Sequence, residues 1–298
     1  MKAVQYTQFG GPEVLQLADV PEPHAGPSQI RVAVRAVGVN PIDWKLRSGA
    51  MGGDLPRGTG VEASGVVDEI GDDVTGVSAG DRVFGSAAGA AAEFTVMSHF
   101  AVIPESLDFA GAAALPVAVE TATRCLDLLG VGDGQTLLIN GASGGVGLAA
   151  VQLARVRGAR VIGSGGPRSQ DRLREFGAEP VVYGEGMAEQ VRALAPGGVD
   201  RAIDMALSGG IATLVQLAGG PDSVIAIADF QGAQEHGVRF TGGGSESAWH
   251  ALDDVGELID AGRFTLPVAR VLPMSQIGEA QRLSEEGHVG GKIVVTTD

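Results

Sequence analysis

A glycine-rich turn is the segment whose residue types and spacing best suit chemistry. The apolar run at residues 137–139 would form a buried strand, residues 140–147 read Asn-Gly-Ala-Ser-Gly-Gly-Val-Gly, and an Ala-, Val- and Leu-rich helix would follow to about residue 157. Glycines let a backbone approach a pyrophosphate, and the free N–H groups and positive dipole end of the helix favour negative charge. The pattern therefore predicts a phosphate-binding turn that needs no basic side chain.

The turn departs from the full G-x-G-x-x-G spacing of dinucleotide-binding folds. Ala142 stands where the first glycine would be, and Gly144 and Gly147 occupy the other two positions. Because buried strand-to-helix turns also carry glycines for packing alone, the motif by itself leaves both interpretations open. The residues expected to contact a cofactor here are Ala142, Ser143, Gly144, Gly145, Val146 and Gly147.

The segment after the second predicted strand indicates which dinucleotide would bind. An acidic residue there would bind the adenosine ribose of NAD, but residues 164–169 read Ser-Gly-Gly-Pro-Arg-Ser. Hydroxyls, a glycine turn and a guanidinium suit a phosphate monoester, so we expect NADPH, bound by Ser164, Gly166 and Arg168. The alternative is that Arg168 is a solvated charge that begins a surface helix. Further cofactor contacts are expected at Tyr183 and Ile227, in the third and fifth predicted strands.

The elements around the turn predict an α/β nucleotide-binding domain. Strand-like and helix-like segments alternate after the turn, as expected of parallel strands joined by crossover helices. Six strands are predicted, the number in a full doubly wound dinucleotide-binding sheet. They lie at about residues 137–139, 160–163, 180–183, 199–204, 223–228 and 238–241.

The two ends of the chain have a different pattern. Up to about residue 102, short runs broken by Gly and Pro predict an all-β unit, and residues 108–129 then turn helical with an interruption at Pro116. A last strand at residues 292–296 has no place in the nucleotide sheet, so we expect it to return to the β unit. Helices are expected at residues 245–261 and 275–286. The expected domains are residues 1–115 with 264–298, and residues 116–263.

Composition limits the possible partners and the compartment. The 298 residues are 44% hydrophobic and carry a formal net charge of −15, which opposes binding to nucleic acid or to an anionic membrane. No apolar run is long enough for a membrane span, the N-terminus has no signal-peptide core, and Cys125 is the one cysteine. A cytoplasmic protein is therefore expected.

Metal sites and two other enzyme classes are disfavoured by the residue inventory. A catalytic zinc ion needs three ligands held together, and no two of the histidines are paired in sequence. Neither Tyr6 nor Tyr183 precedes a Lys by four residues, as a short-chain dehydrogenase requires. Residues 141–145 could form a hydrolase nucleophile elbow, but the six-strand order and Arg168 argue against it. The isolated histidines are His24, His99, His236, His250 and His288.

Several motifs together resemble the zinc-independent quinone oxidoreductases of the medium-chain dehydrogenase/reductase superfamily. They are Asn-Pro-Ile-Asp-Trp-Lys at 40–45, Gly-Val-Glu at 60–62, Gly-Asp-Arg-Val at 80–83, Thr-Ala at 121–122, the turn at 142–147, and Gly-His-Val-Gly-Gly-Lys-Ile-Val at 287–294. The N-P-x-D-x-K variant is similar to the alkenal and enone reductases. The zinc ligands of related alcohol dehydrogenases are replaced around Val39 and Val61. The resemblance implies a GroES-like β domain, which carries the substrate site, and a Rossmann domain.

The resemblance also implies roles for individual residues. Asn40 and Lys45 would lie beside nicotinamide and substrate with Asp43 orienting them, and Thr121 would contact the nicotinamide end. Each has an ordinary alternative: Asn40 could open a turn, Asp43 could cap a helix, and Lys45 could be a solvated charge. Lys292 is either a charge at the end of a strand or a cofactor contact.

The function implied is a metal-free transfer of hydride from NADPH to a quinone or to the β-carbon of an α,β-unsaturated carbonyl. Two alternatives stay open. One is an enoyl reductase that acts on a biosynthetic intermediate, and the other is a non-catalytic NADPH-binding sensor or structural protein. The expected partner is a small molecule, and a homodimer is expected through the sheet edge near residues 238–241.

Overall fold

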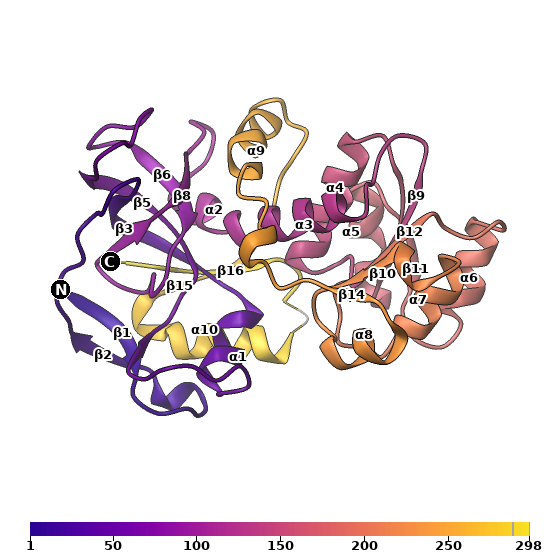
Figure 1. The fold of residues 1–298 in the computed structure, drawn as a ribbon, viewed down its shortest axis with the longest axis horizontal. Helices are drawn as coiled ribbons and strands as arrows, with labels where there is room; N and C mark the ends of the chain where they lie inside the picture. The colour runs from indigo at the N-terminus through magenta and orange to yellow at the C-terminus, as the bar shows by residue number, and fades with distance from the viewer. Residues whose placement is uncertain (288, 298) are drawn as a thin grey trace. The chain divides into compact units, whose positions relative to one another are not determined.

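The structure is a computed structural model that describes residues 1–287 and 289–297 (Figure 1). His288, one of the five isolated histidines, lies outside the described residues. The chain divides into two compact units. The first comprises Met1–Val117, Leu252–Gly262 and the chain from residue 266 onward, and the second comprises Ala118–Ala251 and Arg263–Thr265.

The first unit is built mainly of short strands. They are β1 (Lys2–Tyr6), β2 (Gln16–Asp19), β3 (Ile30–Val39), β4 (Arg57–Gly58), β5 (Glu62–Ile70), β6 (Arg82–Ser86), β7 (Phe94–Met97), β8 (His99–Val102), β15 (Val268–Pro273) and β16 (Lys292–Thr296). One sheet has the order β2-β1-β4, and the other has the order β15-β16-β3-β5-β6-β8, with β7 also paired to β3. The expected return of the last strand is confirmed, because β16 pairs antiparallel with β3 and sets Ile293 opposite Val39.

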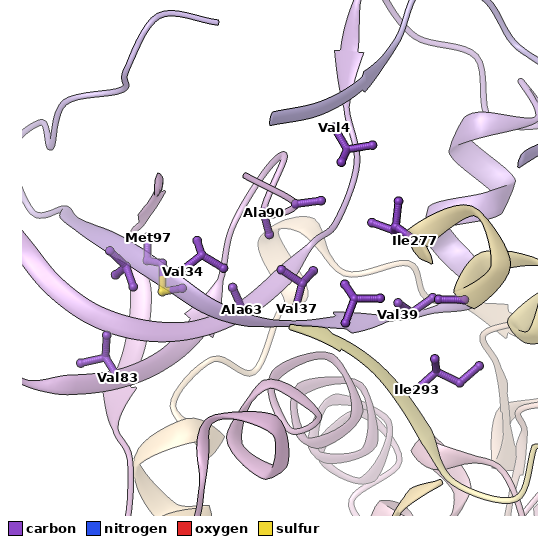
Figure 2. Packing of buried hydrophobic residues seen from close by; sticks show 14 of the residues in the cluster. Val4, Val34, Val37, Val39, Ala63, Val83, Ala90, Met97, Ile277 and Ile293 are labelled. Atoms are coloured by element: carbon purple, nitrogen blue, oxygen red, sulfur yellow. The ribbon is translucent and has the colours of Figure 1, made fainter. Parts of the chain in front are cut away.

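A bulge in β3 shapes the core of this unit. Ile30, Val32 and Val34 pack into one buried hydrophobic cluster, but further along the strand Val37 and Val39 enter the same cluster (Figure 2). Side chains of a regular strand alternate between faces, so the switch from even to odd numbers requires an irregularity. The pairing with β5 shifts register between Val34 and Ala36. The bulge therefore keeps both halves of β3 on the core.

The second unit contains the predicted six-stranded parallel sheet (Figure 1). Its strands are β9 (Thr136–Asn140), β10 (Arg160–Gly165), β11 (Glu179–Val182), β12 (Arg201–Asp204), β13 (Val224–Ala226) and β14 (Arg239–Phe240). The order is β11-β10-β9-β12-β13-β14. Successive crossovers run outward from β9 on one side and from β12 on the other, so right-handed connections place helices on both faces. The topological switch point lies between β9 and β12.

Helices complete both units. Those of the first unit are α1 (Pro41–Arg47), α2 (Phe109–Ala113), α9 (Ala251–Asp260) and α10 (Ile277–Glu286). Those of the second are α3 (Pro116–Leu128), α4 (Gly145–Val156), α5 (Gln170–Glu175), α6 (Met187–Leu194), α7 (Ile211–Leu217) and α8 (Phe230–His236). α9 begins later than the sequence suggests, because Ser247 has an extended backbone. Among the described residues no helix is long and apolar enough to cross a membrane.

Candidate functional site

The N-P-x-D-x-K motif forms the start of α1, directly after β3. Pro41 occupies the first turn, where its missing N–H costs nothing and its fixed φ suits a helix. The backbone N–H of Asn40 donates to Asp43 Oδ2 at 2.7 Å, which closes the helix start. Asp43 therefore does cap the helix, one of the roles the sequence leaves open for it.

A buried polar cluster joins the ends of three strands in the first unit. Lys292 Nζ donates to Glu62 Oε1 (2.7 Å) and to Asn40 Oδ1, and Asn40 Nδ2 donates to Glu62 Oε1 (2.7 Å). The other carboxylate oxygen of Glu62 accepts from the backbone N–H of Val117 at 2.7 Å. All three side chains are at most 5% exposed. Charge pairing and these hydrogen bonds offset the cost of burying two ions.

This cluster changes what Asn40 and Lys292 are able to do. Both ends of the Asn40 amide are used by Glu62 and Lys292, so the side chain ties the junction of β3 and α1 to the first residues of β5 and β16. Lys45 is different: it is half-buried, its ammonium lies 5.8 Å from the ring centre of Trp44, and it forms no ion pair with any described residue. Of the three residues expected to be catalytic, Lys45 alone has an uncommitted charged group.

Burial perturbs the carboxyl group of Asp43. The pKa of Asp43 is raised from 3.8 to about 7, mainly because burial removes solvent and in part because of the nearby negative charge of Glu62. The N–H of Asn40 and the charge of Lys292 oppose the shift. A carboxyl group with such a pKa changes protonation near neutral pH.

In the second unit the glycine-rich turn has the geometry that a pyrophosphate site requires. Gly141 has φ +83°, a left-handed conformation that favours glycine, and Gly144 caps α4. A Cβ on Gly147 would lie 2.4 Å from the carbonyl oxygen of Gly141, so α4 approaches the turn too closely for any side chain there. The first N–H groups of α4 have no partner within the helix. The residues present therefore fit a dinucleotide phosphate.

Ala142, at the position of the expected first glycine, is accommodated by the neighbouring strand. It is fully buried, and a Cβ on Gly163 of β10 would lie only 2.9 Å from its methyl group. The Ala142 N–H donates to the Ser164 carbonyl at 2.9 Å. The missing glycine in the turn is thus compensated by a glycine in β10.

The loop after β10 contains an exposed arginine, and its Gly166 lies beside an aromatic ring. Arg168 is exposed and, in the described part of the chain, makes no ion pair or hydrogen bond. Tyr183 is 46% exposed, and a Cβ on Gly166 would lie 3.5 Å from its ring. The Gln170 amide donates to the carbonyls of Gly165, Gly166 and Val181, which fixes the loop. Gly166 and Tyr183 therefore lie next to each other, as expected if both contact the cofactor.

Three residues that are expected to contact the cofactor form hydrogen bonds within the protein. The Ser164 hydroxyl is fully buried and donates to Asn140 Oδ1 at 2.7 Å. The Thr121 hydroxyl donates to Glu120 at 3.1 Å, within a buried ion pair of Glu120 with Arg124. Ile227 bonds through its N–H to the Asp204 carbonyl at 3.0 Å. Cofactor contact by these residues stays a prediction.

Sequence reasoning missed two buried acids at these sites. Glu62 is the hub of the first cluster and was visible as part of the Gly-Val-Glu motif. Asp204 ends β12 and accepts from Asn140 Nδ2 at 2.7 Å; its signal was an acid at the end of a predicted strand. In residues 1–287 and 289–297, no group of three His, Cys, Asp or Glu side chains could hold a metal ion.

Comparisons with known proteins agree with this arrangement. The family model of the alcohol dehydrogenase GroES-like domain matches residues 26–128, and that of the zinc-binding dehydrogenase matches residues 176–295. The human quinone oxidoreductase is 39% identical over 58% of this chain and 55% of its own length, so the chain spans about half of that curated relative.

Two solved structures are similar over the whole chain. The quinone oxidoreductase from Coxiella burnetii is 31% identical with a TM-score of 0.86, over 100% of this chain and 99% of that one. A mycobacterial protein complexed with NADPH is 27% identical with a TM-score of 0.84, over 100% and 99% of the two chains. On this evidence the chain belongs to the quinone oxidoreductase family of the medium-chain dehydrogenase/reductase superfamily.

Proposed function

We propose that the chain is an NADPH-dependent oxidoreductase that delivers a hydride to a quinone or to the β-carbon of an α,β-unsaturated carbonyl. The observation that carries this proposal is the glycine-rich turn at the switch point of the parallel sheet, with Gly147 kept free of a side chain against Gly141. The NADPH complex of the mycobacterial neighbour supports a pyridine nucleotide as the cofactor class.

The residues after β10 favour NADPH over NADH. No acid stands at the end of that strand to repel a 2′-phosphate, and Arg168 is exposed and bonds to none of the residues that the structure describes. A guanidinium binds a phosphate monoester through charge-assisted hydrogen bonds, and the Tyr183 ring beside Gly166 offers a wall for the same group.

When bound, NADPH supplies the hydride from C4 of its nicotinamide ring. The chain's own residues would then stabilise the negative charge that develops on the substrate carbonyl oxygen. We assign that role to the Lys45 ammonium. Asn40 and Asp43 would act by fixing the start of α1, since the Asn40 amide and Asp43 Oδ2 are bound within the first unit.

The direct test follows the loss of reduced-nicotinamide absorbance with NADPH and with NADH against a panel of quinones, enones and enoyl thioesters. Consumption of NADPH with a quinone or enone supports the proposal. Turnover confined to enoyl thioesters would instead favour the biosynthetic alternative. Tight NADPH binding with no consumption by any acceptor would favour the sensor, and absence of NADPH binding would refute the proposal.

Arg168→Ala tests the cofactor preference. If the guanidinium holds the 2′-phosphate, the dissociation constant for NADPH should rise by about tenfold to a hundredfold, the value of one or two charge-assisted hydrogen bonds. The constant for NADH should not change. Arg172→Ala on the same surface segment is the charge-matched control, and equal losses of NADPH and NADH binding in Arg168→Ala would contradict the assignment.

We also propose that two chains form a dimer through β14, the edge strand of the nucleotide sheet. Light scattering of the purified chain tests this, and a strictly monomeric mass would rule it out.

A further inference from the structure

A directional chain of hydrogen bonds lies directly behind the glycine-rich turn. Asn140 Nδ2 donates to Asp204 Oδ1 (2.7 Å), Ser164 Oγ donates to Asn140 Oδ1 (2.7 Å), and the Gly141 N–H donates to Ser164 Oγ (3.1 Å). Asn140, Ser164 and Asp204 are at most 2% exposed. We infer that Asp204 is a positioning residue that fixes the nucleotide-binding turn through Asn140 and Ser164. This inference rests on the proposed binding of a pyridine nucleotide at that turn.

The direction of every bond follows from the carboxylate. A carboxylate only accepts hydrogen bonds, so it must face the NH₂ group of Asn140. The Asn140 carbonyl oxygen is thereby turned toward Ser164 and can only accept the hydroxyl proton. The Ser164 lone pairs are then left to accept the N–H of Gly141. One acid thus determines the orientation of an amide, a hydroxyl and a backbone group.

The last donor in this series of hydrogen bonds is the N–H of Gly141, the residue on which the turn depends. Gly141 opens the turn with φ +83°, and its carbonyl oxygen is the atom that α4 approaches at Gly147. The segment after β12 also touches Gly141, because a Cβ there would lie 3.0 Å from Ala206 and 3.2 Å from Met205. Asp204 therefore acts on the turn through both its side chain and the backbone that follows it.

Strand register explains why these residues meet. Asn140 is the last residue of β9, and it pairs with Asp204, the last residue of β12. Ser164 lies near the end of β10, on the other side of β9. The chain of hydrogen bonds thus crosses the switch point where a doubly wound sheet binds its ligand.

Two serine variants separate this role from ordinary packing. Ser164→Ala breaks the link between Asn140 and Gly141 and should weaken NADPH and NADH binding equally, by about tenfold, the value of one buried hydrogen bond. Ser208→Ala is the matched control, because Ser208 also bonds Asn140 Nδ2 (2.9 Å), whereas the Gly141 N–H donates to Ser164 and not to Ser208. It should leave both dissociation constants within about twofold of the wild type.

An exchange of the acid and the amide provides the decisive test. Asn140→Asp places two carboxyl groups in contact and should raise the dissociation constants for NADPH and NADH by more than about tenfold at neutral pH. In the double variant Asn140→Asp with Asp204→Asn, the new amide at position 204 donates to the new carboxylate at position 140. That carboxylate still accepts from Ser164. Dissociation constants measured by fluorescence titration should then return to within about threefold of the wild type.

The outcomes distinguish this inference from the proposed function. If the wild type binds neither NADPH nor NADH, the proposed function fails. If the wild type binds and the double exchange does not restore affinity, while its unfolding transition matches the wild type, the positioning role is refuted. Equal affinity of wild type and Ser164→Ala would also refute it, and that milder variant remains informative if Asn140→Asp does not fold.

Discussion

At the scale of single residues, the first unit depends on buried charges that are closely matched. Glu62 accepts from Lys292, Asn40 and the N–H of Val117, so each of its oxygens has a partner. Asp43 lies beside this cluster and has a pKa raised to about 7 by burial. Asn40 is expected to lie beside nicotinamide and substrate, which stays a prediction, and its amide also belongs to this cluster. The motif therefore identified the residue types at this site, but it did not show which residues hydrogen-bond to one another.

Glu62→Gln should destabilise the first unit strongly, because it leaves the Lys292 ammonium buried without a counter-charge. The expected loss is about 3 kcal/mol in the free energy of unfolding, measured by chemical denaturation. Glu62→Gln with Lys292→Met removes both charges and should recover part of this loss. A single variant within about 1 kcal/mol of the wild type would contradict the role of the ion pair.

Asp43→Asn should change how stability depends on pH. The folded-state pKa of Asp43, about 7, is above its usual 3.8, so the folded chain binds the extra proton between these values. The contribution of this group to stability is thus fully present below about pH 4 and declines as pH rises toward 7. The Asn variant loses that decline, which amounts to about 2–3 kcal/mol between pH 5 and pH 8.

Urea denaturation at both pH values measures the Asp43 effect. The control is Asp54→Asn at an exposed position, which changes the net charge equally and should keep the slope of the wild type. Parallel pH profiles for wild type and Asp43→Asn would show that the carboxyl group is not perturbed as described.

At the scale of elements, α4 packs directly against the backbone of the turn that precedes it. The backbone of α4 meets that of the turn at Gly147 and Gly141, where no side chain fits. Gly144 caps the same helix with φ −78°, and a Cβ there would have its nearest neighbour at 3.6 Å. Two glycines of one motif therefore serve different purposes.

Gly147→Ala should destabilise the second unit by about 2 kcal/mol and abolish detectable nucleotide binding, since the new methyl group would displace backbone atoms. Gly144→Ala is the matched control and should unfold at nearly the temperature of the wild type. Calorimetry compares the two. Equal unfolding temperatures for both variants would mean that the close approach at Gly147 has no energetic cost.

The sequence predicts elements well where a local pattern determines them. The six parallel strands, the turn into α4 and the return of β16 were all accessible, because apolar runs, glycines and strand order carry them. The buried networks were not. Glu62 and Lys292 are 230 positions apart, and only the pairing of β16 with β3 and of β3 with β5 brings them together. Periodicity gives no information on such a register.

At the scale of the whole molecule, the chain combines two units with separate sheets and a strongly acidic composition, with a net charge of −15. Family membership follows from matches to both units, since one family model covers residues 26–128 and the other residues 176–295. The second of these models is described as zinc-binding. The expectation of metal-free chemistry therefore needs its own experiment.

Treatment with a strong chelator should leave the reductase activity of the chain unchanged, because the proposed reaction uses the nicotinamide and the protein's own cations. Activity and metal content are measured before and after treatment, with a zinc-dependent dehydrogenase as the positive control. Loss of activity that added zinc restores would overturn the metal-free mechanism.

The pairing of β16 with β3 also sets an order of events during synthesis. Ribosomes release the chain from the N-terminus, so β3 and β5 emerge long before residue 292. Until then the edge of β3 at residues 36–39 lacks its neighbour, and Glu62 lacks the cation that balances it. The first unit therefore begins to be synthesised before the second unit and is completed after it. The nascent chain must keep this open edge from pairing with other strands while the entire nucleotide sheet is made.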